Sequence, residues 1–246
     1  MPALGVLLLL VQVGFAVHAV RTGRPYWWIG IIMFVPAVGC ATYFFAEVLP
    51  EITRSRAARQ AVRDAQTLID PERDYRAAVD RFAESDMVET RSQLAAECMN
   101  LKRYQEAVDL YRGTLIGHYA HDPHLMLRLA EAQFLNGDPD GTVKTLEELK
   151  AHNPDFDSAA GHLLYARALE AAQRMADALR EYAALAGYYP GEEARARYAL
   201  LLLRTGDVDQ ARDVFRELIR KVDRAPRHYA RAEREWYNLA KQHVPD

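Results

Sequence analysis

The residues best suited to chemistry are His121-Asp122-Pro123-His124, a short run in the middle of the chain. Imidazole and carboxylate groups bind zinc and related metals, so the run has the residue types of a metal site. Pro123 and the position of the run between two predicted helices favour a turn instead, with Asp122 as the N-cap of the next helix. His18, near the end of an apolar segment, is a second candidate for a functional polar group, although it can reach polar surroundings from there.

Other arrangements that carry chemistry are missing from the sequence. It has no glycine-rich phosphate loop, no nucleophile motif and no pair of carboxylates in an apolar setting. Cys40 and Cys98 lie in different regions without CxxC spacing, so neither a disulfide framework nor a cysteine metal site is encoded. The formal net charge of -3 argues against a general nucleic-acid binder. We therefore expect no catalytic, cofactor-binding or metal-binding residue, and a function in binding.

A short cassette recurs five times between residues 70 and 215. Each copy is a turn, then two residues, then alanine or once threonine, then a large apolar residue four positions on. From the second copy onward the steps are 35, 36 and 33 residues, the period of a two-helix repeat. The first step is only 29 residues, so the first repeat is shortened. The pairs are Ala78 with Phe82, Ala107 with Tyr111, Thr142 with Leu146, Ala178 with Tyr182, and Ala211 with Phe215.

The helix predicted before each of the last four cassettes contains a large residue followed by alanine. These pairs occupy the place of the Leu-Gly pair of the tetratricopeptide repeat, and the chain resembles that family over roughly residues 58–223. The resemblance implies an all-α solenoid of helix-turn-helix repeats. Trp236 and Leu239 lie in a final helical segment that we expect to cap the last repeat. The four pairs are Leu94-Ala95, Leu129-Ala130, Tyr165-Ala166 and Tyr198-Ala199.

The resemblance also implies that the first helix of each repeat lines an inner groove for partner proteins or peptides. A known clamp of this family holds a C-terminal carboxylate with Asn and Lys, but here those positions are Ser92, Leu127, Leu163 and Ala196, so an apolar helix fits better. The alternative, that Leu127 and Leu163 belong to the core, stays open. The predicted groove residues are Met99, Asn100, Leu127, Glu131, Phe134, Leu163, Arg167, Leu200 and Arg204.

Two uncharged segments precede the repeats. Leu4 to Val20 has 17 residues and Tyr26 to Ala46 has 21, near the roughly 20 that a transmembrane helix needs. They predict a transmembrane helical hairpin with helices at about residues 3–20 and 26–47. The resulting domains are residues 1–50 for the hairpin and 51–246 for the solenoid. A cleaved signal peptide is disfavoured, because no Lys or Arg precedes the first apolar run.

The second segment, Trp28 to Phe44, contains a Trp, an apolar run, Pro, Gly and Tyr in that order. With the apolar helix before it, it resembles the N-terminal two-helix segment of cardiolipin synthases and related phospholipase D type enzymes. Catalysis in those enzymes belongs to a His-x-Lys motif, and none of the eight histidines here is followed two positions later by Lys. The resemblance therefore implies a shared anchor in membrane lipid, without the phosphodiesterase chemistry.

The arginines flanking the hairpin predict its orientation. Two lie in the loop between the segments, whereas four follow Pro50, and the more basic side normally faces the cytoplasm. The four could also contact anionic lipid, although a solvated helix face explains them equally well. We expect an integral protein of the bacterial inner membrane with its repeats in the cytoplasm. The membrane-proximal arginines are Arg54, Arg56, Arg59 and Arg63.

The sequence thus predicts a membrane-anchored scaffold for protein-protein interaction. The alternative is an accessory subunit of a membrane assembly or lipid-metabolism complex, either associated with phospholipid synthesis or similar to the cytochrome c maturation proteins. The latter also join two membrane helices to such repeats, but their helices are separated by a long basic loop. The five residues from Arg21 to Pro25 make that alternative less favourable. An independent enzyme is the least favoured reading.

Overall fold

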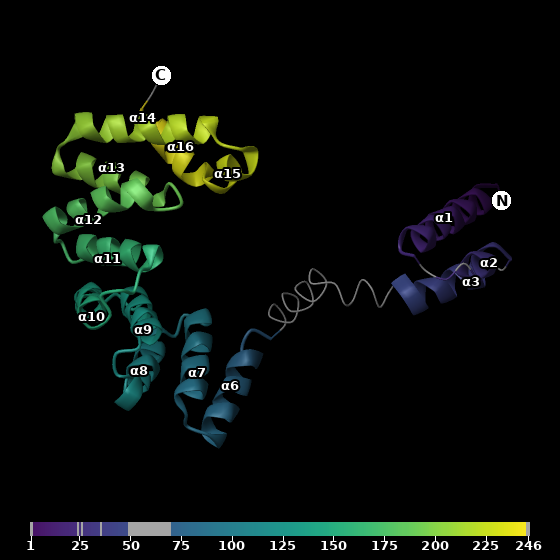
Figure 1. The fold of residues 1–246 in the computed structure, drawn as a ribbon, viewed down its shortest axis with the longest axis horizontal. Coiled ribbons are helices and arrows are strands. Elements are labelled where there is room, and N and C mark those ends of the chain that lie inside the picture. The colour runs from purple at the N-terminus through teal and green to yellow at the C-terminus, as the bar shows by residue number, and fades with distance from the viewer. Residues whose placement is uncertain (1, 24, 26, 35, 49–69, 245–246) are drawn as a thin grey trace. The chain divides into compact units, whose positions relative to one another are not determined.

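The computed structural model describes residues 2–23, 25, 27–34, 36–48 and 70–244. The chain divides into two compact units, residues 1–73 and 74–246 (Figure 1). Every regular element in the described residues is helical, as predicted. The boundary expected near residue 50 lies outside the described residues and remains a prediction. So do the roles of the four membrane-proximal arginines, Arg54, Arg56, Arg59 and Arg63.

The N-terminal unit contains α1 (Pro2–Arg21), α2 (Trp27–Phe34), α3 (Pro36–Tyr43) and a π-helical segment, η1 (Phe44–Val48). Helix α1 matches the helix predicted at residues 3–20. The single helix predicted at residues 26–47 is wrong, because α2 ends before Pro36, whose ring clashes with the preceding turn and which has no N–H to donate. Among the described residues, no helix combines the length and apolar character needed to cross a bilayer, so the two predicted crossings are not confirmed.

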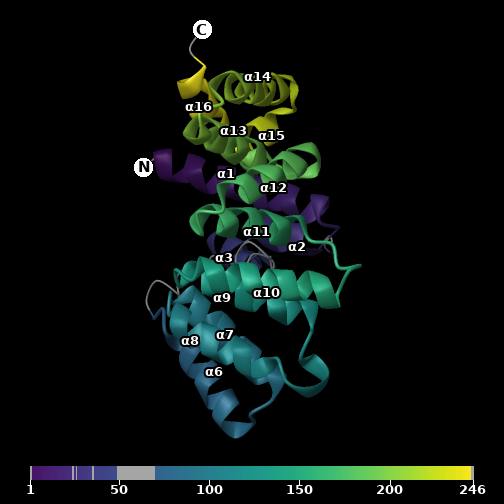
Figure 2. The same ribbon diagram turned by 90° about the vertical axis from the view of Figure 1, so that its left-hand side faces the viewer.

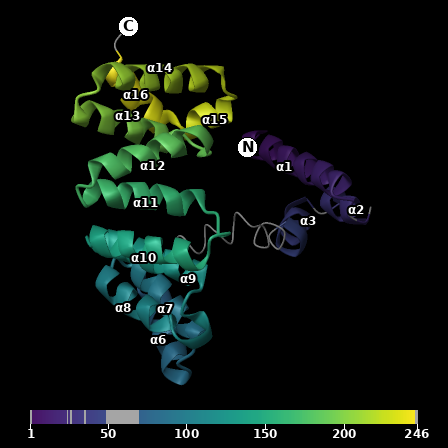
Figure 3. The same cartoon turned by 60° about the vertical axis from the view of Figure 1, so that its left-hand side comes forward.

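The second unit is a stack of helix pairs. The pairs α7–α8, α9–α10, α11–α12 and α13–α14 follow one another in chain order, from α6 at one end to α16 at the other (Figures 1 and 3). Figure 2 shows the same order from the side. The helices are α6 (Arg73–Glu84), α7 (Val88–Asn100), α8 (Tyr104–Thr114), α9 (Pro123–Leu135), α10 (Pro139–His152), α11 (Ala159–Ala171), α12 (Met175–Tyr188), α13 (Glu193–Thr205), α14 (Val208–Arg224), α15 (Arg227–Ala232) and α16 (Arg234–His243), with a 3-10 turn, η2, at Gly117–Tyr119.

The predicted repeat register is confirmed by burial. All five cassette residues are 0% exposed and lie in the second helix of a pair, where a small side chain lets the two helices approach. Four of their five large partners are also buried, and Phe82 is half-buried. The alanines of the first-helix pairs are 0% exposed as well. The periodic pattern in the sequence therefore specifies the core of the solenoid.

The turns within the four pairs share one backbone feature. The residue just before each second-helix N-cap has a positive φ: 59° at Lys102, 81° at Gly137, 61° at Gln173 and 95° at Gly206. Glycine adopts this conformation freely, whereas other residues pay roughly 1–2 kcal/mol for it. The repeat geometry therefore imposes the left-handed turn even at the two positions where the sequence lacks glycine.

The C-terminal helices close the stack. Trp236 and Leu239 of α16 are half-buried against a core that includes Phe215 of α14 and Ala196 of α13. The guanidinium of Arg197 lies over the Trp236 ring, 5.4 Å from its centre. Helix α16 thus occupies the capping position predicted for it, and its exposed residues are mostly polar.

Candidate functional site

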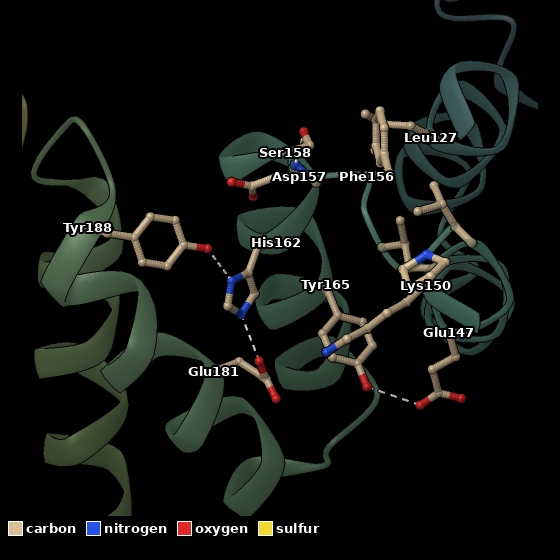
Figure 4. Close-up of a pocket in the computed structure, with 14 residues that line it drawn as sticks. Leu127, Glu147, Lys150, Phe156, Asp157, Ser158, His162, Tyr165, Glu181 and Tyr188 are labelled. Atoms are coloured by element: carbon tan, nitrogen blue, oxygen red, sulfur yellow. Dashed lines mark hydrogen bonds and ion pairs between the residues drawn. The ribbon is translucent and has the colours of Figure 1, made fainter. Parts of the chain in front are cut away.

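A cavity of about 270 Å³ lies between the second and third complete helix pairs. Its walls come from α9, α10, α11 and α12 and from the loop that joins α10 to α11 (Figure 4). Pockets for complete small-molecule ligands usually measure about 300–1,000 Å³, so this cavity suits a single side chain or fragment. Its apolar lining consists of Leu127, Leu146, Leu149, Pro154 and Phe156.

His162 forms the polar centre of the cavity wall. It lies in the first turn of α11, which begins after Ser158, whose hydroxyl caps the helix by accepting from the Gly161 N–H at 3.0 Å. His162 Nε2 is 2.6 Å from Glu181 Oε2, and Nδ1 forms a hydrogen bond with the Tyr188 hydroxyl (Figure 4). Both ring nitrogens are engaged, so in this geometry the imidazole fixes the wall and has no free nitrogen for proton transfer to a ligand.

Charged groups surround the cavity, and two of them have no partner in the described part of the chain. The Glu147 carboxylate accepts from the Tyr165 hydroxyl at 3.0 Å and lies 3.4 Å from Arg174. Burial and this hydrogen bond raise the pKa of Tyr165 to about 12, so the phenol remains a donor at neutral pH. Lys150 and Asp157 are exposed, and no described group pairs with either. They can therefore bind groups of opposite charge on a partner.

The structure places the predicted groove residues in separate groups. Met99, Asn100 and Glu131 line one shallow hollow, and the Glu131 carboxylate accepts from Arg128 at 2.9 Å. Leu127 lines the cavity described above.

The other predicted groove residues contact neighbouring repeats. The Arg167 guanidinium lies 4.9 Å from the centre of the Phe134 ring. Arg204 donates to Glu170 at 2.5 Å, which joins α13 to α11. Leu200 is half-buried against the C-terminal core. Leu163 is 5% exposed and packs with Val143 and Ala166, so the open alternative is settled in favour of the core for this residue.

Four polar residues of the cavity were missed by sequence reasoning: Lys150, His162, Glu181 and Tyr188. Glu181 and Tyr188 are seven residues apart on α12, so their shared helix face could have been inferred. Their meeting with His162 depends on how α11 packs on α12, which no local pattern reveals.

The turn predicted at the histidine run is confirmed. Asp122 Oδ1 accepts from the Leu125 N–H at 2.9 Å, and Pro123 is the first residue of α9. The His121 ring stacks on His152 with centres 3.7 Å apart, while His124 contacts Phe156 edge-on. Among the described residues, no group of three His, Cys, Asp or Glu side chains is placed to hold a metal.

The N-terminal unit has an apolar exterior and pairs its polar groups internally. Gln12 Nε2 donates to the Ile32 carbonyl at 2.8 Å, and His18 Nδ1 is 3.0 Å from the Tyr43 hydroxyl. The hydroxyl of Thr42 donates to the carbonyl one turn earlier in its helix. The exposed large apolar residues are Leu9, Val11, Val13, Val17, Val20, Trp27, Ile31, Met33, Phe34, Val38 and Phe45.

Comparisons with known proteins agree with this repeat architecture. The nearly identical TPR-like repeats of a Podosopora anserina protein described as a kinesin light chain superpose with a TM-score of 0.52 and 18% identity, over 63% of this chain and 85% of that one. A thermophilic TPR protein of Thermus thermophilus gives a TM-score of 0.50 and 16% identity, over 75% and 98%. No curated protein matches the sequence. Residues 99–167 and 193–223 match the tetratricopeptide repeat family. The C-terminal unit of this chain is therefore built from tetratricopeptide repeats.

Proposed function

We propose that this chain is a membrane-anchored scaffold whose repeat unit binds a polypeptide partner. Tetratricopeptide repeats generally bind proteins or peptides and are generally not enzymes. The observation that carries the proposal here is the cavity between α9–α10 and α11–α12, which has an apolar lining and two unpaired opposite charges, Lys150 and Asp157, beside it. An apolar side chain of the partner enters the cavity, and flanking charges of the partner set its direction.

The binding surface extends beyond the cavity along the first helices. Asn100 and Arg204 are exposed, while Glu131 and Arg167 are half-buried and reach the surface. Large apolar and arginine side chains often supply most of an interface's binding energy. We include these residues and Met99 in the proposed surface, together with Leu127, Phe134 and Leu200 at its base. Leu163 is left out because it belongs to the core.

Anchoring in a membrane is supported by the chemistry of the N-terminal unit. In water, exposed apolar patches are usually limited in extent, and polar side chains face the solvent. Here large apolar residues cover the exterior, whereas Gln12 and His18 bond across the unit. Lipid favours this arrangement, because polar groups within the bilayer need partners in the protein. We propose that residues 1–48 insert into a membrane.

The side of the membrane follows from the arginine count. Four arginines after residue 50 against two in the loop favour repeats in the cytoplasm of a bacterial cell. Protease added to right-side-out membrane vesicles should leave the repeat unit intact. Degradation of the repeats in sealed vesicles would reverse the orientation.

A photo-crosslinking amino acid at position 150 tests partner binding at the cavity. Lys144 provides a matched control, because it is also an exposed lysine on α10 but does not line the cavity. In living cells we expect a discrete protein adduct from position 150 that position 144 gives at most weakly. Equal adducts from both positions, or none from position 150 in a normally expressed chain, would contradict the proposed site.

A further inference from the structure

Five exposed arginines gather where the last helices meet. They come from the end of α14, from α15 and from the start of α16, three short segments that lie together at the C-terminal end of the repeat unit (Figure 1). Within the described part of the chain, none of their guanidinium groups has a hydrogen-bond or ion-pair partner. We call this group the arginine patch: Arg220, Arg224, Arg227, Arg231 and Arg234.

The patch differs from the rest of α14. Arg212 and Arg216, earlier in the same helix, lie 3.7 Å from Asp209 and 3.2 Å from Asp213. Residues 220–234 contain six cations and two carboxylates, a formal charge of +4 in a chain whose formal net charge is -3. The two carboxylates are occupied, since Asp223 accepts from the Tyr237 hydroxyl and Glu233 accepts from the Glu192 N–H. The positive charge of the patch is therefore left for a ligand.

Two of the arginines line a concave surface. Arg227 and Arg234 border a hollow of about 410 Å³, whose other lining includes Val222, Ala230 and Asn238. A guanidinium presents several N–H donors in a plane and can bind both oxygens of a carboxylate at once. The hollow thus combines two such donors with the amide of Asn238, a further donor and acceptor.

Anionic lipid and an acidic polypeptide could both supply carboxylate or phosphate groups, but the surface favours the polypeptide. Proteins that bind lipid surfaces commonly insert large apolar side chains beside their cations. Between residues 209 and 244, all of them described, no large apolar side chain is exposed. A hollow also receives a protruding chain better than it receives a flat bilayer.

We propose that the arginine patch binds an acidic segment, rich in Asp or Glu, of a partner protein. The proposal goes beyond the function given above, because the hollow shares no residue with the α9–α12 cavity. Carboxylates of the segment pair with Arg227 and Arg234 in the hollow, and the other three arginines attract the flanking acids.

Fluorescence anisotropy with the full chain in neutral detergent tests this. The probe is a labelled peptide of alternating glutamate and alanine, and the same peptide with lysine in place of glutamate should not bind. The variant Arg227→Gln with Arg234→Gln should weaken binding at least about tenfold, because it removes two charge-assisted hydrogen-bond donors. The matched control, Arg212→Gln with Arg216→Gln, loses the same charge on α14 and should change binding less than about twofold. Both variants should melt like the parent.

Other outcomes would overturn the proposal. Equal weakening by the two double variants would mean that only overall charge matters. Failure of the parent to bind the glutamate peptide would exclude an acidic polypeptide. If Arg227→Gln with Arg234→Gln leaves peptide binding unchanged and lowers binding to vesicles of anionic phospholipid, the patch contacts lipid instead. Replacement of both residues by Lys should weaken peptide binding less than Gln, since charge remains but the planar donors are lost.

Discussion

Glu192→Gln is expected to destabilise the repeat unit by about 3 kcal/mol. The Glu192 carboxylate is 0% exposed and accepts from Arg195 at 2.5 Å, Lys221 at 2.7 Å and Tyr229 at 2.6 Å. The amide keeps the shape but removes the charge, so Arg195, whose side chain is 11% exposed, is left buried without its anion. Urea unfolding followed by circular dichroism measures the loss.

The neighbouring residue supplies a control. Glu193 also binds an arginine, Arg197 at 2.7 Å, but its side chain is 24% exposed. Partly exposed ion pairs contribute about 1 kcal/mol or less, so Glu193→Gln should lie near the parent. A Glu192→Gln variant as stable as Glu193→Gln would mean that the buried cluster does not hold α13, α14 and α15 together.

The same carboxylate makes stability depend on pH. Burial alone would raise the pKa of Glu192, but hydrogen bonds from Lys221, Tyr229 and Arg195 outweigh burial and lower it below its ordinary value of 4.5. A lowered folded-state pKa means that the stabilisation is complete above the unfolded-state value and is lost as pH falls through the folded-state value. The parent should therefore lose more stability than Glu192→Gln when pH falls below about 4.3. Parallel losses in both proteins would contradict this assignment.

Ala211→Arg is expected to have a comparable or larger effect, about 4 kcal/mol or more. Ala211 is 0% exposed where α14 packs on α13, so the arginine would place a charge without a partner between two helices or force them apart. Thermal melting should show a partly unfolded or aggregating chain.

An exposed alanine nearby separates this effect from a general effect of charge. Ala232, at the end of α15, is exposed, and Ala232→Arg adds the same side chain to the surface. It should melt within about 0.5 kcal/mol of the parent. Similar melting of both variants would show that the repeat register is mistaken.

The solenoid was predictable because its core depends on periodic positions. Small residues such as Ala107 and Ala178 mark helix contacts that recur in every repeat, so spacing alone identifies them. The turn geometry is shared too, but its residues vary: Gly137 and Gly206 signal a positive φ, whereas Lys102 does not. Helix boundaries and core therefore follow from the sequence better than individual turns do.

The cavity and the buried cluster could not be predicted in this way. The Glu192 N–H donates to Glu233, and the Glu192 side chain meets Tyr229, in contacts between segments about forty residues apart that no repeat position specifies. The His162 contacts similarly require the observed packing of α11 on α12. In the N-terminal unit, Pro36 could have indicated the end of α2, but the uninterrupted apolar composition favoured one long helix.

Membrane extraction of the full chain tests most directly whether the repeat scaffold is anchored in a membrane. The account predicts that the chain stays in the membrane pellet in high salt and alkaline carbonate and is released only by detergent. The variant Val13→Arg with Phe34→Arg, at two exposed apolar positions of the N-terminal unit, should move much of the chain to the soluble fraction, because each arginine costs about 2.5 kcal/mol or more within lipid. The matched variant Met87→Arg with Ile116→Arg, at two exposed apolar positions of the repeat unit, should remain in the pellet. Release of the parent chain by salt or carbonate, or equal behaviour of the two double variants, would contradict the anchor.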